Sequence, residues 1–184
     1  IPVSSANSIN IGRLLPQMVY YFWAARQFTQ KSEVQPPTFV VPSGNYGNLT
    51  AGLFAKKLGL PCGKFVAAVN KNSIVPQFLA SGKFEPRKTE MTYSSAMDVG
   101  APSNWARITE LYGDKRTANS DKGQATRDKG YDADLRKRIE GDLEVISISE
   151  AETKKMIAEV YKKFGYIADP HTAVGIAAAL KFRG

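Results

Sequence analysis

Apolar residues in this chain occur in two kinds of run that alternate along the sequence. Residues 38–41 and 65–69 are short, almost unbroken apolar runs, typical of strands covered on both faces of a parallel sheet. Between them, residues 49–56 carry apolar side chains at helical spacing, and the pattern ends in two lysines and Gly59, as helices commonly do. The order strand, turn, helix, strand predicts an α/β fold, and we expect a three-layer arrangement with helices on both faces of the sheet.

Helical spacing also appears before and after this unit. A helix beginning near Arg13 is apolar on nearly every side, so we expect it to be an interior element. Pro16 suits the first turn of that helix, because its missing N–H costs nothing there. Residues 105–111 show one apolar helical face, and Asn104 is the expected cap at its start.

The last third of the chain has the clearest helix boundaries. Ser149 and Glu152 have the spacing of a capping box, and the helical face that follows ends at Gly165. Asp169 is then a good cap for a final helix over residues 172–182, with a proline at the first helical position. No internal repeat or low-complexity tract interrupts this pattern.

The turn after the first predicted strand combines two glycines with two asparagines. Gly44 and Gly47 permit left-handed or tightly curved backbone, and Asn48 is the natural cap of the helix that follows. A turn of this kind aims several backbone N–H groups and the positive end of the helix dipole at one point, which suits a phosphate. The same residues also occur in ordinary strand-to-helix turns for conformational reasons alone.

Four separated motifs of this chain resemble those of bacterial and fungal threonine synthases, and they occur in the same order. They are the substrate-binding segment at residues 5–15, the cofactor-phosphate loop at residues 41–52, a central motif at residues 95–105 and a late helix start at residues 169–175. The similarity covers nearly the whole chain. It implies a fold like that of tryptophan synthase and dependence on pyridoxal 5'-phosphate.

The resemblance further implies the conversion of O-phospho-L-homoserine and water into L-threonine and phosphate, which is a carbon–oxygen lyase activity in amino-acid biosynthesis. It places the cofactor phosphate on the backbone amides of the predicted loop. The cofactor-binding residues expected on this basis are Gly44, Asn45, Tyr46, Gly47 and Asn48. For Tyr46, packing beside the cofactor ring and a plain surface position are both open.

Asn7, Ser8 and Arg13 are the residues expected to hold the phosphate of the substrate. An arginine fork gives bidentate contact with a phosphate, and the two polar side chains supply oriented donors. From spacing alone, the plainer interpretation is that Asn7 and Ser8 cap the following helix and that Arg13 is a solvated surface charge. The family resemblance favours substrate binding.

The family holds its cofactor on a lysine within a His-Gly-Pro-Thr-x-Ala-Phe-Lys type of motif, and no stretch of this chain matches it. Lys71 lacks the flanking pattern, so we assign no catalytic residue to this chain. An upstream Ser-Gly-Asp-Thr-Gly and a downstream Gly-Thr-Ala-His-Pro segment are likewise missing. We therefore expect residues 1–184 to be part of a catalytic domain whose other parts lie upstream and downstream, and to be inactive alone.

Single residues exclude several other chemistries. His171, the only histidine, stands among good helix-capping residues, so a structural role is favoured over general-base catalysis. One histidine and one cysteine do not make a zinc shell, so no metal site is expected.

Cys62 cannot form an internal disulfide, and no signal peptide or membrane-length apolar run is present, so we expect a soluble cytoplasmic protein. Asp98 is either a turn residue or a support for the pocket, and we assign it no chemistry.

The chain has 25 basic and 17 acidic residues, a formal net charge of +8, which suits either nucleic acid or small anionic substrates. Many charges of both signs fall within residues 113–141, which we predict to be a solvated loop or mobile excursion. No nucleic-acid recognition motif accompanies them, so a small substrate is favoured. The oligomeric state is left open by the sequence.

Two other interpretations stay open at this point. One is a related pyridoxal-phosphate phospholyase or a serine/threonine dehydratase, and because a dehydratase needs no grip on a substrate phosphate, Arg13 discriminates between them. The other is a non-catalytic, phosphate-binding remnant that acts by association, which the missing lysine supports.

Overall fold

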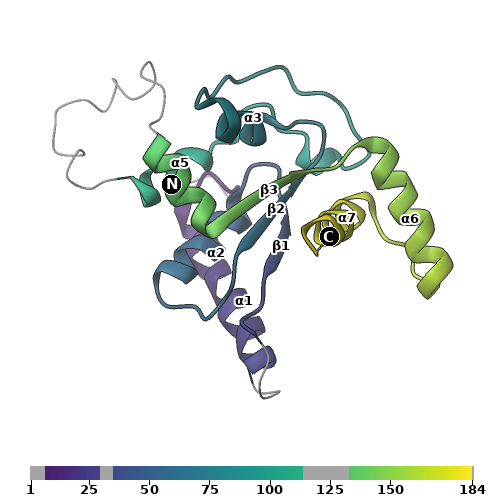
Figure 1. Cartoon of the computed structure of the whole chain (residues 1–184), viewed down its shortest axis with the longest axis horizontal. Helices are drawn as coiled ribbons and strands as arrows, with labels where there is room; N and C mark the ends of the chain where they lie inside the picture. Colours follow the sequence, from purple (N-terminus) through teal and green to yellow (C-terminus); the bar gives the residue numbers. More distant parts are fainter. Residues whose placement is uncertain (1–6, 30–34, 114–132, 184) are drawn as a thin grey trace, which may run out of the picture.

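Three parallel strands form the centre of the part of the chain that a computed structural model describes, residues 7–29, 35–113 and 133–183 (Figure 1). The strands lie side by side in chain order, with the second in the middle. They are β1 (Phe39–Pro42), β2 (Phe65–Val69) and β3 (Leu143–Ser147). All residues of β2 are buried, as predicted for a strand covered on both faces.

Helices cover both faces of this sheet, which confirms the three-layer α/β fold. Figure 1 shows α1 and α2 on one side of the strands and α7 on the other. Side chains alternate accordingly: Phe65 and Ala67 belong to the apolar cluster with α1 and α2, whereas Ala68 packs with Val174 of α7. The described helices are α1 (Ile11–Thr29), α2 (Gly47–Lys57), α3 (Ile74–Ser81), a short 3-10 turn η1 (Ser95–Met97), α4 (Trp105–Tyr112), α5 (Ala133–Asp142), α6 (Glu150–Phe164) and α7 (Pro170–Arg183).

Hydrogen bonds beyond the ends of the strands fix the loops at the carboxyl edge of the sheet. The backbone N–H of Ser43, just after β1, donates to the carbonyl of Ala68 at 2.8 Å. The N–H of Ile148, just after β3, donates to the carbonyl of Val69, also at 2.8 Å. Because the strands are parallel, the loops after all three meet at one edge, which is where ligands of open α/β sheets bind.

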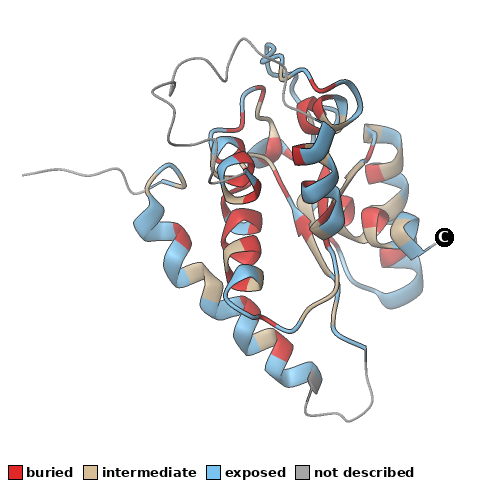
Figure 2. Cartoon of the chain, turned by 60° about the vertical axis from the view of Figure 1, so that its left-hand side comes forward, coloured by how far each residue is buried: buried red, intermediate tan, exposed pale blue. Residues whose placement is uncertain are grey.

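Helix α1 differs from the prediction of an interior element. Leu14, Tyr21 and Ala25 are buried, but Val19 and Trp23 on another face are 62% and 66% exposed. Much of the helix is drawn as exposed in Figure 2. Only one stripe of the helix packs against the core in the described structure, although its residues are apolar on nearly every side. The helix also begins at Ile11, before Arg13, so its proline lies beyond the first turn. None of the described helices, α1 included, is long and apolar enough to cross a membrane.

The predicted caps of the last two helices are confirmed, and α7 is slightly longer than the predicted 172–182. Ser149 caps α6 by accepting from the N–H of Glu152, while the Glu152 carboxylate accepts from the N–H of Ser149 at 2.8 Å. Gly165 ends the helix in the left-handed conformation, with φ 65°. Asp169 then caps α7, because its carboxylate accepts hydrogen bonds from the N–H groups of His171 and Thr172.

The predicted charged loop over residues 113–141 is wrong at its end, because residues 133–141 lie within α5. Leu135 and Ile139, four residues apart, are buried among the charges and join the main apolar cluster. Arg138 also donates from Nε to the carbonyl of Tyr112 at 2.8 Å. Residues 114–132 lie outside the described residues.

The acid stability of the chain should depend on the caps of α6 and α7. A hydrogen bond from Lys181, and after it the hydrogen bonds with Ser149, lower the pKa of Glu152 from 4.5 to about 2. The pKa of Asp169 is lowered from 3.8 to about 2, chiefly by the hydrogen bond from the Thr172 hydroxyl. Because both pKa values are lower in the folded state than in the unfolded chain, the two carboxylates stabilise the folded state fully when the pH is above their ordinary pKa values. Their contribution is lost as the pH falls toward 2.

Urea unfolding measured between pH 7 and pH 2 tests this dependence. Glu152→Gln should weaken the fall in the free energy of unfolding between about pH 4.5 and pH 2. The matched control is Glu85→Gln, at an exposed glutamate away from both helix starts. An unchanged pH profile in Glu152→Gln would contradict the role assigned to the capping box.

Candidate functional site

Tyr46 gives the loop between β1 and α2 its shape. Its backbone is left-handed, with φ 59° and ψ 14°, and it is the one non-glycine residue with positive φ among those that the structure describes. The side chain is buried, and its ring meets that of Trp105 edge-on with 5.6 Å between centroids. Burial raises the pKa of its phenol above the ordinary value. Tyr46 therefore packs in the interior, and the surface interpretation is wrong.

The two loop glycines serve close approach instead of the left-handed backbone that the sequence suggested. A Cβ on Gly44 would lie 2.7 Å from the Cα of Met97, and one on Gly47 would lie 2.8 Å from the Cβ of Ser8. Neither glycine has a positive φ. Glycine is thus needed because backbone from η1 and side chain from the N-terminal segment press against the loop.

The loop presents unbonded backbone donors at the start of α2. Within the described residues, no group accepts a hydrogen bond from the N–H groups of residues 44–48. Tyr46 holds the N-cap position, so α2 begins at Gly47 and the predicted cap at Asn48 is wrong by two residues. Unbonded N–H groups at the positive end of a helix dipole are the arrangement that commonly binds a phosphate.

The two loop asparagines hold neighbouring segments. Asn48 accepts from the Tyr21 hydroxyl at 2.6 Å and donates to Gln17 at 3.0 Å, and both partners lie on α1. Asn45 donates from Nδ2 to the Ser8 hydroxyl at 2.7 Å and accepts from the N–H of Ser103 at 2.6 Å. Their side-chain amides therefore tie the loop to α1, to Ser8 and to Ser103.

The structure brings Ser8 beside this loop, although the two are far apart in sequence. Asn7 accepts from the N–H of Ile9 at 3.0 Å, while Asn10 accepts from the N–H of Gly12 at 2.9 Å and so caps α1. The interpretation of Asn7 and Ser8 as helix caps is therefore wrong, because the helix begins two residues before Arg13. Residues 5 and 6 of the same motif lie outside the described residues.

Arg13 lies in the first turn of α1, three residues after the cap. Its side chain is in an exposed position, and its backbone carbonyl accepts from Gln17 Nε2 at 2.7 Å. Gln17 in turn accepts from Asn48 of the loop. The helix start that carries Arg13 is thus tied to the start of α2.

Several known proteins resemble this chain in sequence and fold, although no protein-family model matches it. The chain is 44% identical over 176 residues to the threonine synthase of Buchnera aphidicola subsp. Schizaphis graminum, covering 95% of this chain and 35% of that protein. The crystal structure of threonine synthase from yeast superposes with a TM-score of 0.86 at 36% identity, covering 96% of this chain and 38% of that one. Over the segment that it spans, the chain belongs to the threonine synthase family.

A further solved structure agrees, the X-ray structure of pyridoxal-phosphate-bound threonine synthase from Brucella melitensis. It has a TM-score of 0.84 and 34% identity, and it matches 97% of this chain and 39% of that one. The chain spans a little over a third of the length of the curated threonine synthases that it matches. The expected three-layer fold is confirmed by the same structures.

Asn104 is a residue of this threonine synthase segment for which the helical pattern predicts only a cap. It does occupy the N-cap position of α4, but its side chain makes no capping bond. The amide is fully buried and donates to the carbonyls of Ser8 and Asn45 at 3.1 and 3.0 Å. Helix periodicity gives no hint of contacts with residues so distant in sequence. The only feature of the sequence that could have drawn attention to Asn104 was its place within the central motif.

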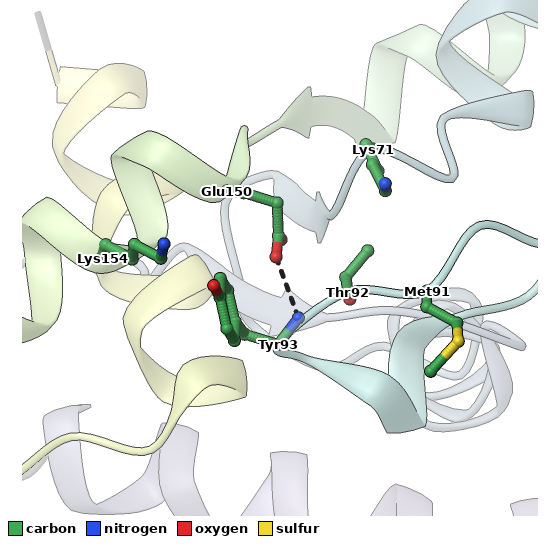
Figure 3. A pocket seen from close by; sticks show the side chains of 6 residues that line it. All are labelled: Lys71, Met91, Thr92, Tyr93, Glu150 and Lys154. Carbon is green, nitrogen blue, oxygen red and sulfur yellow. Dashed lines mark hydrogen bonds between the residues drawn. The ribbon is translucent and has the colours of Figure 1, made fainter.

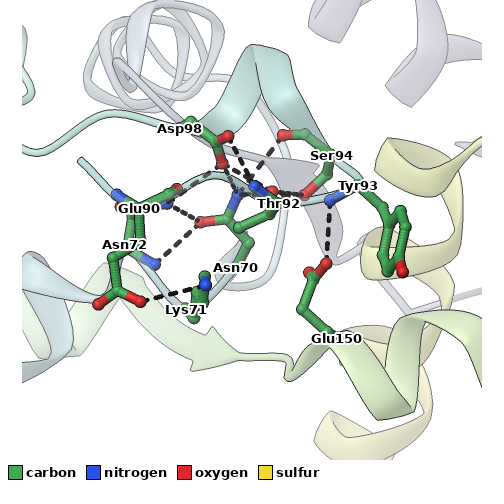
Figure 4. A network of polar contacts seen from close by, with 9 residues as sticks. All are labelled: Asn70, Lys71, Asn72, Glu90, Thr92, Tyr93, Ser94, Asp98 and Glu150. Atoms are coloured by element: carbon green, nitrogen blue, oxygen red, sulfur yellow. Dashed lines mark hydrogen bonds and ion pairs between the residues drawn. The ribbon is translucent and has the colours of Figure 1, made fainter.

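Asp98 accepts hydrogen bonds at the carboxyl end of β2 (Figure 4). Its carboxylate accepts from the amides of Asn70 at 2.8 Å and Asn72 at 3.1 Å. It also accepts from the N–H and the hydroxyl of Thr92 at 2.9 and 2.6 Å. This network ties the loop after β2 to η1, whose backbone presses on Gly44. Asp98 therefore supports the shape of the site.

A pocket of about 370 Å³ opens on the same edge, but none of the predicted site residues lines it. Figure 3 shows Lys71 on one wall, and Tyr93 with Lys154 on another. Lys71 pairs with Glu90 at 3.1 Å, and the Nζ of Lys154 lies 4.7 Å from the centroid of the Tyr93 ring. Lys71 is therefore held by a carboxylate on the surface.

His171 joins the start of α7 to η1. Its Nε2 accepts from the N–H of Ala96 at 3.1 Å, and its Nδ1 lies 3.0 Å from the Asp169 carboxylate. An accepting Nε2 requires the proton on Nδ1, which then donates to Asp169. The structural role predicted for His171 agrees with these contacts, and no group of three metal-ligating side chains occurs among the described residues.

Gly44→Ala should test the close approach between the loop and η1. The added methyl would meet backbone that cannot move aside cheaply, so we expect a loss of about 1–3 kcal/mol of unfolding free energy. Gly141→Ala is the matched control, because a Cβ there meets nothing within 4 Å and alanine favours a helix. Urea denaturation measures both. Equal stability of the two variants would show that the loop does not need glycine.

Proposed function

We propose that this chain is a segment of a threonine synthase, a pyridoxal-phosphate-dependent enzyme that converts O-phospho-L-homoserine and water into L-threonine and phosphate. The observation that supports this best is the row of unbonded N–H groups at residues 44–48, with Ser8 hydrogen-bonded beside it at 2.7 Å. The likeness to threonine synthases over almost the whole chain supports the same activity.

The cofactor's phosphate fits the loop at the start of α2. The backbone N–H groups of residues 44–48 would bind it, and the helix dipole would favour its negative charge. When bound, pyridoxal phosphate supplies an electron sink for the loss of protons from the substrate carbons. The loop's contribution is to hold the phosphate at a fixed place, because Tyr46 is locked by packing against Trp105 and Asn45 is bonded to Ser103.

The substrate's phosphate is assigned to the neighbouring segment, with Asn7, Ser8 and Arg13 as its binding residues. Ser8 touches the loop through Asn45 and Gly47, and Arg13 lies on the first turn of the adjacent helix. A guanidinium and two neutral polar groups stabilise a departing phosphate by charge and by oriented donors. Two phosphate positions side by side suit a phosphorylated substrate on a phosphorylated cofactor.

We also propose that the protein works in the cytoplasm as a soluble enzyme. The single cysteine of the sequence, Cys62, cannot make an internal disulfide, which fits a reducing compartment. The basic balance of the chain suits a small anionic substrate.

The direct test is the release of phosphate and the formation of threonine from O-phosphohomoserine in the presence of pyridoxal phosphate. The intact protein that contains this sequence should be active. The 184-residue chain, assayed alongside, should not be, because it lacks the lysine motif on which the family holds its cofactor. An intact protein that binds pyridoxal phosphate but does not convert this substrate would disprove the proposed reaction.

Arg13→Ala in the intact protein should separate substrate binding from cofactor binding. Losing a charged contact to phosphate should raise the KM for O-phosphohomoserine by roughly tenfold or more, with the affinity for pyridoxal phosphate nearly unchanged. Arg26→Ala, near the other end of the same helix, is the matched control and should leave both values unchanged. Steady-state kinetics and absorbance titration measure the two effects. A wild-type KM in Arg13→Ala would show that this arginine does not hold the substrate.

A further inference from the structure

We propose that Asn104 and Arg107 of α4 are positioning residues that clamp the Ser8 segment against the phosphate-binding loop. The inference rests on the proposed function, because it assigns the cofactor phosphate to residues 44–48 and the substrate phosphate to the Ser8 segment. Neither residue is assigned a contact with a ligand. Their role is to hold two binding segments in one fixed relation.

Asn104 bridges the two segments with a single buried amide group. Its Nδ2 donates one hydrogen bond to the carbonyl of Ser8 at 3.1 Å and another to the carbonyl of Asn45 at 3.0 Å. Both N–H bonds of the amide are thereby used, one on each segment. The Asn104 side chain is fully buried, so its amide needs both carbonyls as hydrogen-bond partners.

Arg107 orients that amide and adds a second tie to the same segment. Its Nη1 donates to Asn104 Oδ1 at 2.6 Å, which keeps the amide oxygen toward the cation and the Nδ2 toward the two carbonyls. Its Nη2 donates to the carbonyl of Ile9 at 2.6 Å. The flat guanidinium fork reaches both acceptors at once, which the single ammonium of a lysine cannot do in the same geometry.

The clamp fixes where Ser8 presents its hydroxyl. The Ser8 side chain lies between the Asn45 amide at 2.7 Å and Gly47, where no Cβ would fit. The loop itself has separate supports, since Tyr46 packs on Trp105 and Asn48 is bonded to α1. Loosening Arg107 should therefore displace the Ser8 segment and leave the loop in place.

The first experiment compares Arg107→Gln with Arg136→Gln in the intact holoenzyme. Arg136 is a matched control, because it is also partly buried and donates to a backbone carbonyl, that of Leu79 at 2.9 Å. Arg107→Gln should raise the KM for O-phosphohomoserine about tenfold, since charged hydrogen bonds that position the segment are lost. Its kcat and its dissociation constant for pyridoxal phosphate should stay within about twofold of wild type.

Two further variants test the geometry of the clamp. Arg107→Lys keeps the charge but not the fork, so it should not restore the wild-type KM. Asn104→Asp keeps the shape but removes the donors to both segments, so it should weaken substrate and pyridoxal phosphate together. Full rescue by lysine would overturn the clamp. A second result would also overturn it: in Arg107→Gln, the KM and the cofactor dissociation constant rise equally and thermal stability falls. That result would indicate a general structural role.

Hydrogen exchange gives a readout that does not depend on the reaction. The N–H groups of Ile9 and Gly12 are bonded within the clamped segment, and they should exchange about tenfold faster in Arg107→Gln than in Arg136→Gln. Equal exchange in the two variants, with equal KM, would overturn the clamp. Faster exchange in an intact protein that does not convert O-phosphohomoserine would support the clamp and disprove the proposed reaction, so the two failures are distinguishable.

Discussion

The parallel pairing of β1 with β2 and of β2 with β3 is the constraint on which the rest of the structure depends. It directs the chain out of every strand at one edge, and bonds such as that from the N–H of Ser43 to the carbonyl of Ala68 extend the pairing into the loops. The start of α2, the asparagines after β2 and the cap of α6 therefore gather at the carboxyl edge. Among these loops, the one after β1 has backbone N–H groups, those of residues 44–48, that have left the sheet ladder and have no acceptor within the described residues.

Close contact at this edge gives the site its rigidity. Gly44 touches backbone of η1, Gly47 touches Ser8, and Tyr46 keeps an unfavourable left-handed conformation because its ring is buried against Trp105. A residue of this type pays roughly 1 kcal/mol or more for positive φ, which a well-packed aromatic ring offsets. The result is a loop whose N–H groups are held in place, which suits the phosphate-binding role proposed for it. Such preorganisation lowers the entropy lost on binding.

Local signals predicted much of the fold but failed where a contact with a distant segment decides the outcome. The caps at Ser149 and Asp169 are short-range hydrogen bonds, and the structure has both. The predictions of an interior helix for α1 and of a charged loop at residues 133–141 were wrong, because burial depends on which neighbours the fold supplies. The contacts of Asn104 with Ser8 and Asn45 span more than fifty residues, and no periodicity encodes them.

The sequence by itself determined the α/β class, the position of the loop at residues 44–48 and, through four ordered motifs, the threonine synthase family. These follow from residue type and spacing over a few neighbours, where backbone propensity and side-chain hydrogen bonds act. Only the tertiary structure decided that Tyr46 and not a glycine takes the left-handed turn, that Ser8 lies against the loop and that Asn104 with Arg107 holds it there. Those outcomes depend on close packing between segments that are remote in sequence, which one-dimensional spacing does not contain.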